Sequence, residues 1–193
     1  MLKRFLSLFF LLTGSVYAYP TCSPEVSSAV QTLYKIPEAR ELIQKVEADG
    51  PVRVYVTPFP NGSNAMWRAD ERAIILNGNK SRTYGEMLRS ILFEFHNAAA
   101  DKEFMKTDWM AKQGQISKNT YIEQIERIEH SNALSTCNII EQAIAKRIFP
   151  MDARWSIPSD FHFHFQIQKE SGHSQAIAVT YDCLTHNTHV AQR

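Results

Sequence analysis

Two glutamates on the apolar faces of predicted helices are the residues best suited to chemistry in this chain of 193 residues. Glu94 follows Phe93 in a segment rich in leucine, isoleucine and phenylalanine, and Asn97 stands three residues later. Glu129 lies in a second predicted helix, again with an asparagine, Asn132, three residues later. A carboxylate on an apolar helix face is costly unless it is paired, protonated or used. The spacing therefore indicates a site that contains both carboxylates.

Helical geometry, at about 100° per residue, tests which of these side chains share a face. Relative to Ile91, Glu94 lies at about −60° and Asn97 at about −120°. His96 lies at about +140° and therefore points to the opposite side of the helix. Glu94 and Asn97 can thus share a site, and the same arithmetic places Glu129 inside the apolar stripe of its own helix.

Two nearby carboxylates cannot both ionise at their usual pKa, so one of them is held protonated. Such a pair supplies an acid and a base, or two ligands for a metal ion. The alternative is structural: Glu94 and Glu129 could instead cap backbone groups or form buried ion pairs with Arg89, Arg127 or Arg147. Catalytic residues under the first interpretation are Glu94 and Glu129, with Asn97 in support.

Hydrophobic periodicity predicts the α+β elements that must position these residues. The expected order is N-terminal helices, a small antiparallel sheet, two central helices and a C-terminal β-hairpin. A capping box at Thr83 and Glu86 starts the helix of Glu94, and Ser117 caps the helix of Glu129. Residues 108–114 are expected to form a short helix or a loop. Other helices are expected over residues 24–36, 38–47 and 119–148, sheet strands over 52–56, 65–68 and 73–76, and hairpin strands over 161–167 and 176–181.

The N-terminal 18 residues have the layout of a secretory signal peptide. Lys3 and Arg4 form a basic start, residues 5–12 are apolar, and small residues occupy the positions before a cleavage site after Ala18. A membrane anchor is the alternative, but the apolar run is shorter than the ~20 residues that a spanning helix needs. Residues 19–193 are therefore expected to form one secreted or periplasmic domain without a stable membrane span.

The charge of the chain argues against a nucleic-acid partner. Without Lys3 and Arg4, 19 of the 21 basic residues remain against 20 acidic ones, so there is no surplus of positive charge.

The cysteine content predicts a disulfide. In an oxidising compartment, three cysteines predict one disulfide and one free thiol. We expect the disulfide between Cys137 and Cys183, or in a pair that includes Cys22.

The region around Glu94 resembles the zincin metallopeptidases. In that family a strand and a turn precede a helix that carries the His-Glu-x-x-His motif, with two zinc ligands and a glutamate base. The counterparts here are the strand over residues 73–76 and the helix that contains residues 92–98. Aligned on that motif, Phe93 and Asn97 occupy the positions of the two ligands, and only Glu94 matches.

The resemblance covers roughly residues 50–133 and implies a zincin-like fold with a degenerate metal motif. It implies a hydrolase in which Glu94 is the general base. Glu129, where some zincins have a third zinc ligand, would be its acid partner or a metal ligand. The alternative is a secreted pseudoenzyme, a catalytically inactive binding or interaction protein that keeps the fold without the ligands.

A second metal site is suggested by His162 and His164, which alternate with phenylalanines in the expected hairpin. Two histidines on one strand face can bind zinc or copper, with His186 or His189 as a third ligand. A solvated polar strand face is the alternative. The sequence requires no cofactor, although a divalent metal is compatible with it. The aromatic residues are either core residues or part of a groove for a protein, peptide or glycan ligand.

Overall fold

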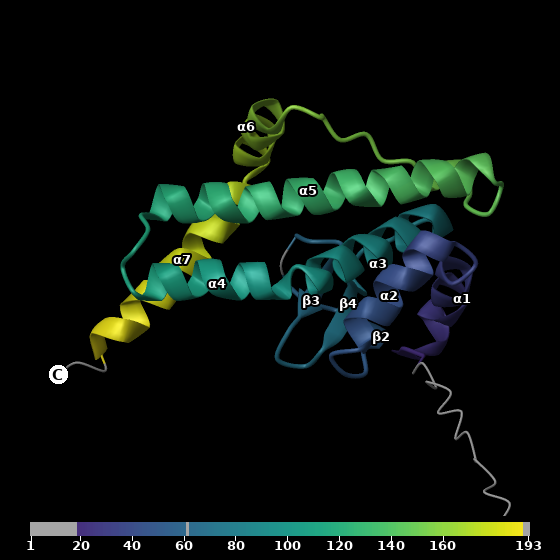
Figure 1. Cartoon of the computed structure of the whole chain (residues 1–193), viewed down its shortest axis with the longest axis horizontal. Coiled ribbons are helices and arrows are strands. Elements are labelled where there is room, and N and C mark those ends of the chain that lie inside the picture. The colour runs from purple at the N-terminus through teal and green to yellow at the C-terminus, as the bar shows by residue number, and fades with distance from the viewer. Residues whose placement is uncertain (1–18, 61, 191–193) are drawn as a thin grey trace, which may run out of the picture.

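A computed structural model describes residues 19–60 and 62–190, with side chains up to residue 186. The expected signal peptide lies outside the described residues. Within them, helices dominate and a four-stranded sheet lies at one end of an elongated molecule (Figure 1). None of the described helices combines the length and the hydropathy needed to span a lipid bilayer.

The sheet is mixed rather than antiparallel, which corrects the prediction. Its order is β1 (Thr21–Cys22), β2 (Arg53–Thr57), β4 (Ala73–Asn77) and β3 (Ala65–Arg68). The first three strands are parallel and β3 is the antiparallel edge strand. β4 lies between β2 and β3, and all five of its residues are buried. The antiparallel pairing of β3 with β4 agrees with the prediction. The parallel pairing of β2 with β4 depends on contacts between residues far apart in the chain, which no local pattern reveals.

Three helices pack around this sheet and enclose the main core. These are α1 (Pro24–Leu33), α2 (Pro37–Glu47) and α3 (Tyr84–Ala99), each close to its predicted bounds. The predicted capping box is present, since the Thr83 side chain accepts from the Glu86 N–H and the Glu86 carboxylate accepts from the Thr83 N–H. Gly85 lies so close to the backbone of Ala153 that an added Cβ would be 2.3 Å from its nitrogen. The first turn of α3 therefore packs directly against the backbone at Ala153.

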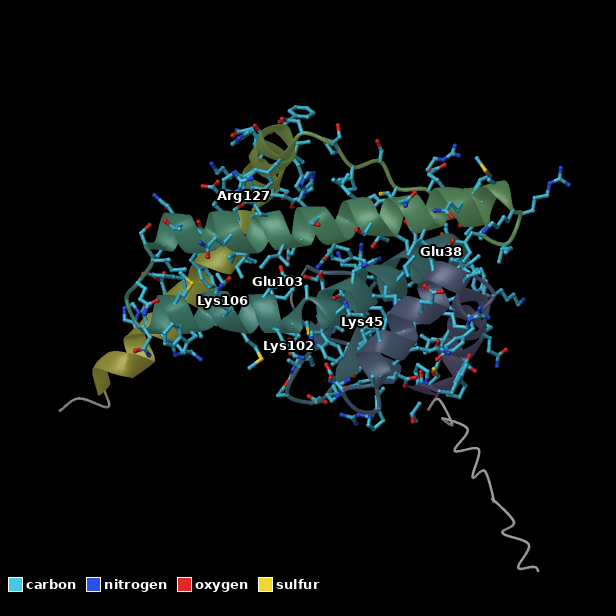
Figure 2. All side chains as sticks on the ribbon, in the orientation of Figure 1. Glu38, Lys45, Lys102, Glu103, Lys106 and Arg127 are labelled. Carbon is cyan, nitrogen blue, oxygen red and sulfur yellow. The ribbon has the colours of Figure 1, made fainter. Side chains whose placement is uncertain are left out.

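The remaining helices form the other end of the molecule. They are α4 (Asp101–Lys112), α5 (Lys118–Ala145), α6 (Phe161–Ser171) and α7 (His173–Val190), with the short helix η1 (Met151–Ala153). Of the segment 108–114, expected to be a short helix or a loop, residues 108–112 belong to α4. The 28-residue α5 runs along both ends, and its direction is opposite to that of α3 and α4 (Figure 1). Exposed charged residues such as Lys45 on α2 and Lys102 and Lys106 on α4 cover the outside (Figure 2).

The predicted C-terminal hairpin is wrong, because its two strands are helices α6 and α7. Asp160 caps α6 by accepting the Phe163 N–H, and Gly172, with φ 84°, ends it in the left-handed conformation. Alternating phenylalanines fit a helix as well as a strand here. Phe161 and Phe165, one turn apart, stack with ring centroids 5.4 Å apart, whereas Phe163 is 63% exposed.

The expected disulfide is also not formed, since all three cysteines are free. The Cys137 thiol donates to the carbonyl oxygen of Trp155 at 3.3 Å, and the Cys22 thiol donates to that of Pro20 at 3.3 Å. Cys183 lies exposed on α7.

Candidate functional site

A cavity of about 590 Å³ lies where the two ends of the molecule meet. The edge strand β3 and helix α3 line one wall, and α4, α5, α6 and α7 line the other. Glu94, Asn97 and Glu129, all singled out from the sequence, face this cavity together with His173. The fold thus brings the predicted carboxylates to one place.

Glu94 on α3 is only 5% exposed, and hydrogen bonds hold its carboxylate in a fixed orientation. The Asn97 side-chain amide donates to its Oε2 at 3.0 Å, and the backbone N–H of Trp67 donates to the carboxylate as well. Burial raises the pKa of Glu94 to about 7; the charge of Glu129 acts in the same direction, and the hydrogen bonds from Asn97 and Trp67 oppose the rise. The carboxyl group therefore titrates in the neutral range instead of remaining ionised there.

The Trp67 N–H is available because β3 is an edge strand. The Asn77 N–H donates to the Asn64 carbonyl oxygen at 2.9 Å, so the backbone N–H and C=O of Asn64 point toward β4. Backbone direction alternates along an antiparallel strand, so the N–H and C=O of Ala65 and Trp67 point away from β4, toward the side where Glu94 lies.

The two Glu/Asn pairs, Glu94 with Asn97 and Glu129 with Asn132, lie close together but form different hydrogen bonds. The Asn132 side-chain amide donates to Asn97 Oδ1 at 3.0 Å, which links α5 to α3. Asn97 in turn donates to Glu94. Asn132 therefore orients the Glu94 pair across the helix interface instead of forming a second pair with Glu129.

Glu129 is less enclosed, with a side chain that is 24% exposed. Burial raises its pKa to about 7, the nearby His173 opposes the rise, and the charge of Glu126 adds to it. Its Oε2 lies 3.5 Å from Nε2 of His173.

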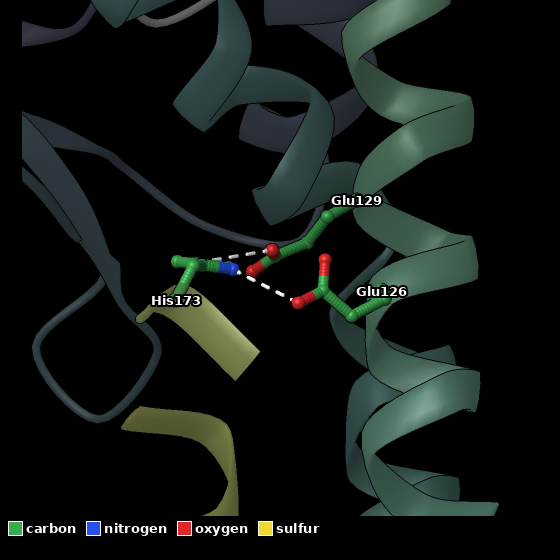
Figure 3. A group of neighbouring side chains, drawn as sticks. All are labelled: Glu126, Glu129 and His173. Atoms are coloured by element: carbon green, nitrogen blue, oxygen red, sulfur yellow. Dashed lines mark hydrogen bonds and ion pairs between the residues drawn. The ribbon is translucent and has the colours of Figure 1, made fainter. Parts of the chain in front are cut away.

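Glu126 and His173 belong to the site but were missed in the sequence. Glu126 is completely buried on α5, where Ser174 Oγ donates to its Oε1 at 2.6 Å and His173 Nδ1 lies 3.2 Å from the same oxygen (Figure 3). The bond to Glu126 raises the pKa of His173. One signal was present: Glu126 and Glu129 are three residues apart and so share a helix face. Their burial becomes evident only once α7 is known to pack there.

The predicted histidine pair is separated by the helical geometry. His162 is exposed on α6, whereas His164 is buried and lies against His130, with ring centroids 4.7 Å apart. His186 contacts the Asp182 carbonyl oxygen at 2.6 Å, and the side chain of His189 lies outside those described. The shared strand face on which the metal prediction for His162 and His164 rested is therefore absent.

Arg89 and Arg127, two of the three arginines proposed as buried partners, are engaged elsewhere. Arg89 donates to the Arg154 carbonyl oxygen at 3.0 Å, and Arg127 pairs with Glu123 at 2.6 Å. Arg147 follows the end of α5 in a left-handed conformation with φ 56°. None of these contacts neutralises Glu94 or Glu129.

His96 is turned away from the cavity, as the helical arithmetic predicts. Burial lowers its pKa to about 4, and the charge of Lys45 on α2 contributes in the same direction. It is therefore neutral at physiological pH.

Aromatic and acidic side chains complete the walls of the cavity. Trp155 packs edge-on against Phe93, with ring centroids 5.4 Å apart, and lies beneath the Arg89 guanidinium. Trp67 Nε1 donates to Asp101 Oδ1 at 3.2 Å. The cavity thus offers flat apolar surfaces next to hydrogen-bonding groups.

One group of side chains among the described residues could hold a metal ion. It consists of Glu126, Glu129 and His173, whose candidate ligand atoms lie within 4.8 Å of one another. The zincin positions do not form such a group, because Phe93 has no donor atom and the Asn97 amide bonds to Glu94 and Asn132.

Comparison of the chain with protein-family models, with curated proteins and with solved structures gives no match.

Proposed function

We propose that this chain is a hydrolase in which Glu94 acts as the general base toward a water molecule in the cavity. The observation that carries the proposal is a buried, oriented carboxylate with a pKa near 7 that lines a cavity large enough for a substrate segment. A base is most effective when its pKa lies near the working pH. The zincin resemblance supports the assignment, because it implies the same role for this glutamate.

An extended peptide is the substrate class that the walls of the cavity favour. The backbone N–H and C=O of Ala65 and the C=O of Trp67 point away from β4 at the open edge of β3, which lines the cavity. Exposed strand edges bind extended peptides by main-chain hydrogen bonds. Trp155 and Phe93 offer apolar surface for side chains of such a peptide. Glu94 lies beside this edge, since the Trp67 N–H donates to it.

The sequence allowed two roles for Glu129, acid partner and metal ligand. Its approach to His173 and its place beside Glu126 favour the second role. Asn97 supports Glu94 by fixing the orientation of its carboxylate, and Asn132 supports Asn97.

A secreted peptide-binding protein without activity is the second candidate. The observation that favours it is the loss of both motif ligands, since Phe93 packs against Trp155 and Asn97 is used in hydrogen bonds. In that case the same cavity would hold a peptide without cleaving it.

A peptide library can separate the two candidates. Residues 19–193 would be incubated with a complex peptide mixture, and new termini would be identified by mass spectrometry. We expect cleavage by the wild-type chain and a loss of roughly 10²- to 10⁴-fold in Glu94→Gln, because a general base contributes about that much. Glu103→Gln, on the exposed face of α4, is the matched control and should cleave like the wild type.

Two outcomes would overturn the hydrolase proposal. Unchanged cleavage in Glu94→Gln would exclude this residue as the base. Retention of peptides by the wild type without any cleavage would favour the binding protein.

A further inference from the structure

We propose that Glu126, Glu129 and His173 form a binding site for a divalent transition-metal ion such as Zn²⁺. The three side chains converge from α5 and from the first residue of α7 (Figure 3). Their candidate ligand atoms lie within 4.8 Å of one another. The zincin resemblance implies a metal role for Glu129 but none for Glu126 or His173.

The strongest reason is an unsatisfied oxygen on Glu126. The side chain is only 1% exposed, and its Oε2 has no hydrogen-bond partner although the atom is buried. A buried carboxylate oxygen without a partner is costly and calls for an explanation. A cation bound between the three side chains would satisfy it.

The other oxygen of Glu126 is arranged as a support for the histidine. Its Oε1 accepts from Ser174 Oγ at 2.6 Å and faces His173 Nδ1 at 3.2 Å. An ion bound between the three side chains would take the place of the proton that Nδ1 shares with this carboxylate, because metal binding displaces protons from its ligands. Nε2 of the same ring lies 3.5 Å from Glu129 Oε2, so the histidine is held between the two carboxylates.

The donor set decides the class of ion. Two carboxylate oxygens with one imidazole nitrogen suit Zn²⁺, Mn²⁺ or Fe²⁺ better than Mg²⁺ or Ca²⁺, which prefer all-oxygen sites. Two negative charges and a neutral imidazole also match the charge of a divalent cation. No cysteine belongs to the group, so the site does not depend on thiol oxidation.

The position of the site suits a catalytic rather than a closed structural metal. Glu129 and His173 line the cavity, while Glu126 lies behind them in the protein interior. Three protein ligands leave a coordination position for water or substrate. A role for the ion in activating water for Glu94 rests on the proposed function, whereas metal binding itself does not.

Isothermal titration of the metal-stripped protein with Zn²⁺ alone tests the proposal. A Cys183→Ser background removes the exposed thiol, which could otherwise bind the ion. We expect about one equivalent of Zn²⁺ to bind and to raise the melting temperature, because a ligand that binds only the folded state stabilises it. Mg²⁺ should bind at least tenfold more weakly, as the donor set predicts.

Variants of the three ligands provide the decisive comparison. His173→Ala and Glu126→Gln should weaken Zn²⁺ binding by at least the roughly 10- to 100-fold seen when supporting groups are removed. Glu129→Gln, at a partly exposed position, tests the same site if the Glu126 variant fails to fold. Glu123→Gln on α5 and His162→Ala on α6 are matched controls with exposed side chains and should bind like the wild type.

The outcomes also separate this proposal from the proposed hydrolase. Failure of the wild type to bind Zn²⁺, or wild-type affinity in both His173→Ala and a glutamate variant, would overturn the metal site. Glu94→Gln should keep full Zn²⁺ affinity while losing cleavage. Zn²⁺ binding without peptide cleavage would therefore retain the metal site and reject the hydrolase.

Discussion

The two ends of this molecule are stabilised very differently. At the sheet end, helices α1, α2 and α3 enclose a large core that includes fully buried Leu33, Leu88 and Phe95. At the helical end, the buried core of the described side chains is small and consists of Ala111, Tyr121, Ile125 and Ile177. The candidate site lies between these two cores, where apolar packing is interrupted by polar side chains.

Helix α5 shows the difference within one element. Its C-terminal part contributes Ile139, Ile140 and Ala143 to the large core, and its N-terminal part contributes Tyr121 and Ile125 to the small one. Between these apolar parts, residues 126–136 carry the polar groups of the site. A rigid helix can hold such groups in place because packing at both of its ends supports it. The polar middle section of α5 therefore lies between two packed cores.

The comparison predicts the largest effect for a truncation in the sheet-end core. Phe95→Ala should reduce the free energy of unfolding by about 3–5 kcal/mol, because it leaves a cavity in a tightly packed core. Phe95 is fully buried and is adjacent to Glu94 in sequence. Urea denaturation followed by circular dichroism would measure the change. A loss below about 1 kcal/mol, as for a typical surface substitution, would contradict the central role of this core.

A smaller effect is expected from the carboxylate at the boundary of the two ends. The pKa of Glu94 rises from its ordinary value of 4.5 to about 7 on folding, mainly through burial. The folded state therefore binds more protons than the unfolded state in this interval. The stabilising contribution is complete below pH 4.5 and is lost as the pH rises through 7, by up to about 3 kcal/mol in total.

Glu94→Gln tests this linkage because glutamine does not titrate. Unfolding of wild type and variant would be compared across this pH interval in the presence of a chelator. The stability of the wild type relative to the variant should fall as the pH rises. Parallel pH profiles for the two proteins would show that burial of Glu94 has no energetic cost.

The smallest effect is expected in the helical-end core. Ile177→Ala on α7 should reduce the free energy of unfolding by about 2 kcal/mol or less, which is at the low end for core truncations. Ile177 is 8% exposed, so neighbouring side chains can move into the space that the substitution leaves. The change should act locally, since α7 belongs to the small core. Hydrogen exchange should show faster exchange in α6 and α7 and unchanged protection in β2 and β4. Equal acceleration in the sheet would mean that the two ends unfold as one unit.

Residues that follow a local rule were predictable from the sequence. The capping box of Thr83 and Glu86 and the strands β2, β3 and β4 all depend on neighbouring residues. The pairing of Glu94 with Asn97, and the separation of His96 from both, followed from helical geometry alone.

Other parts of the fold needed contacts that sequence patterns do not encode. Between residues 161 and 165, phenylalanine alternates with histidine as in a strand. The segment is nevertheless a helix, which Asp160 caps and Gly172 ends. Its Phe161 ring also contacts the Arg127 guanidinium on α5. Parallel pairing of β2 with β4 likewise depends on long-range packing.

The sequence by itself determined where the candidate site lies, because a glutamate in an apolar helix stripe is costly wherever that helix packs. Only the tertiary structure decided the partners of these glutamates. It joined Asn97 to Asn132 across two helices and placed His173 against Glu126 and Glu129. The physical reason is that helix periodicity fixes the direction of a side chain from its own helix, whereas its neighbours come from helices that pack against it. Residues 126 and 173 are 47 positions apart, and no local rule relates them.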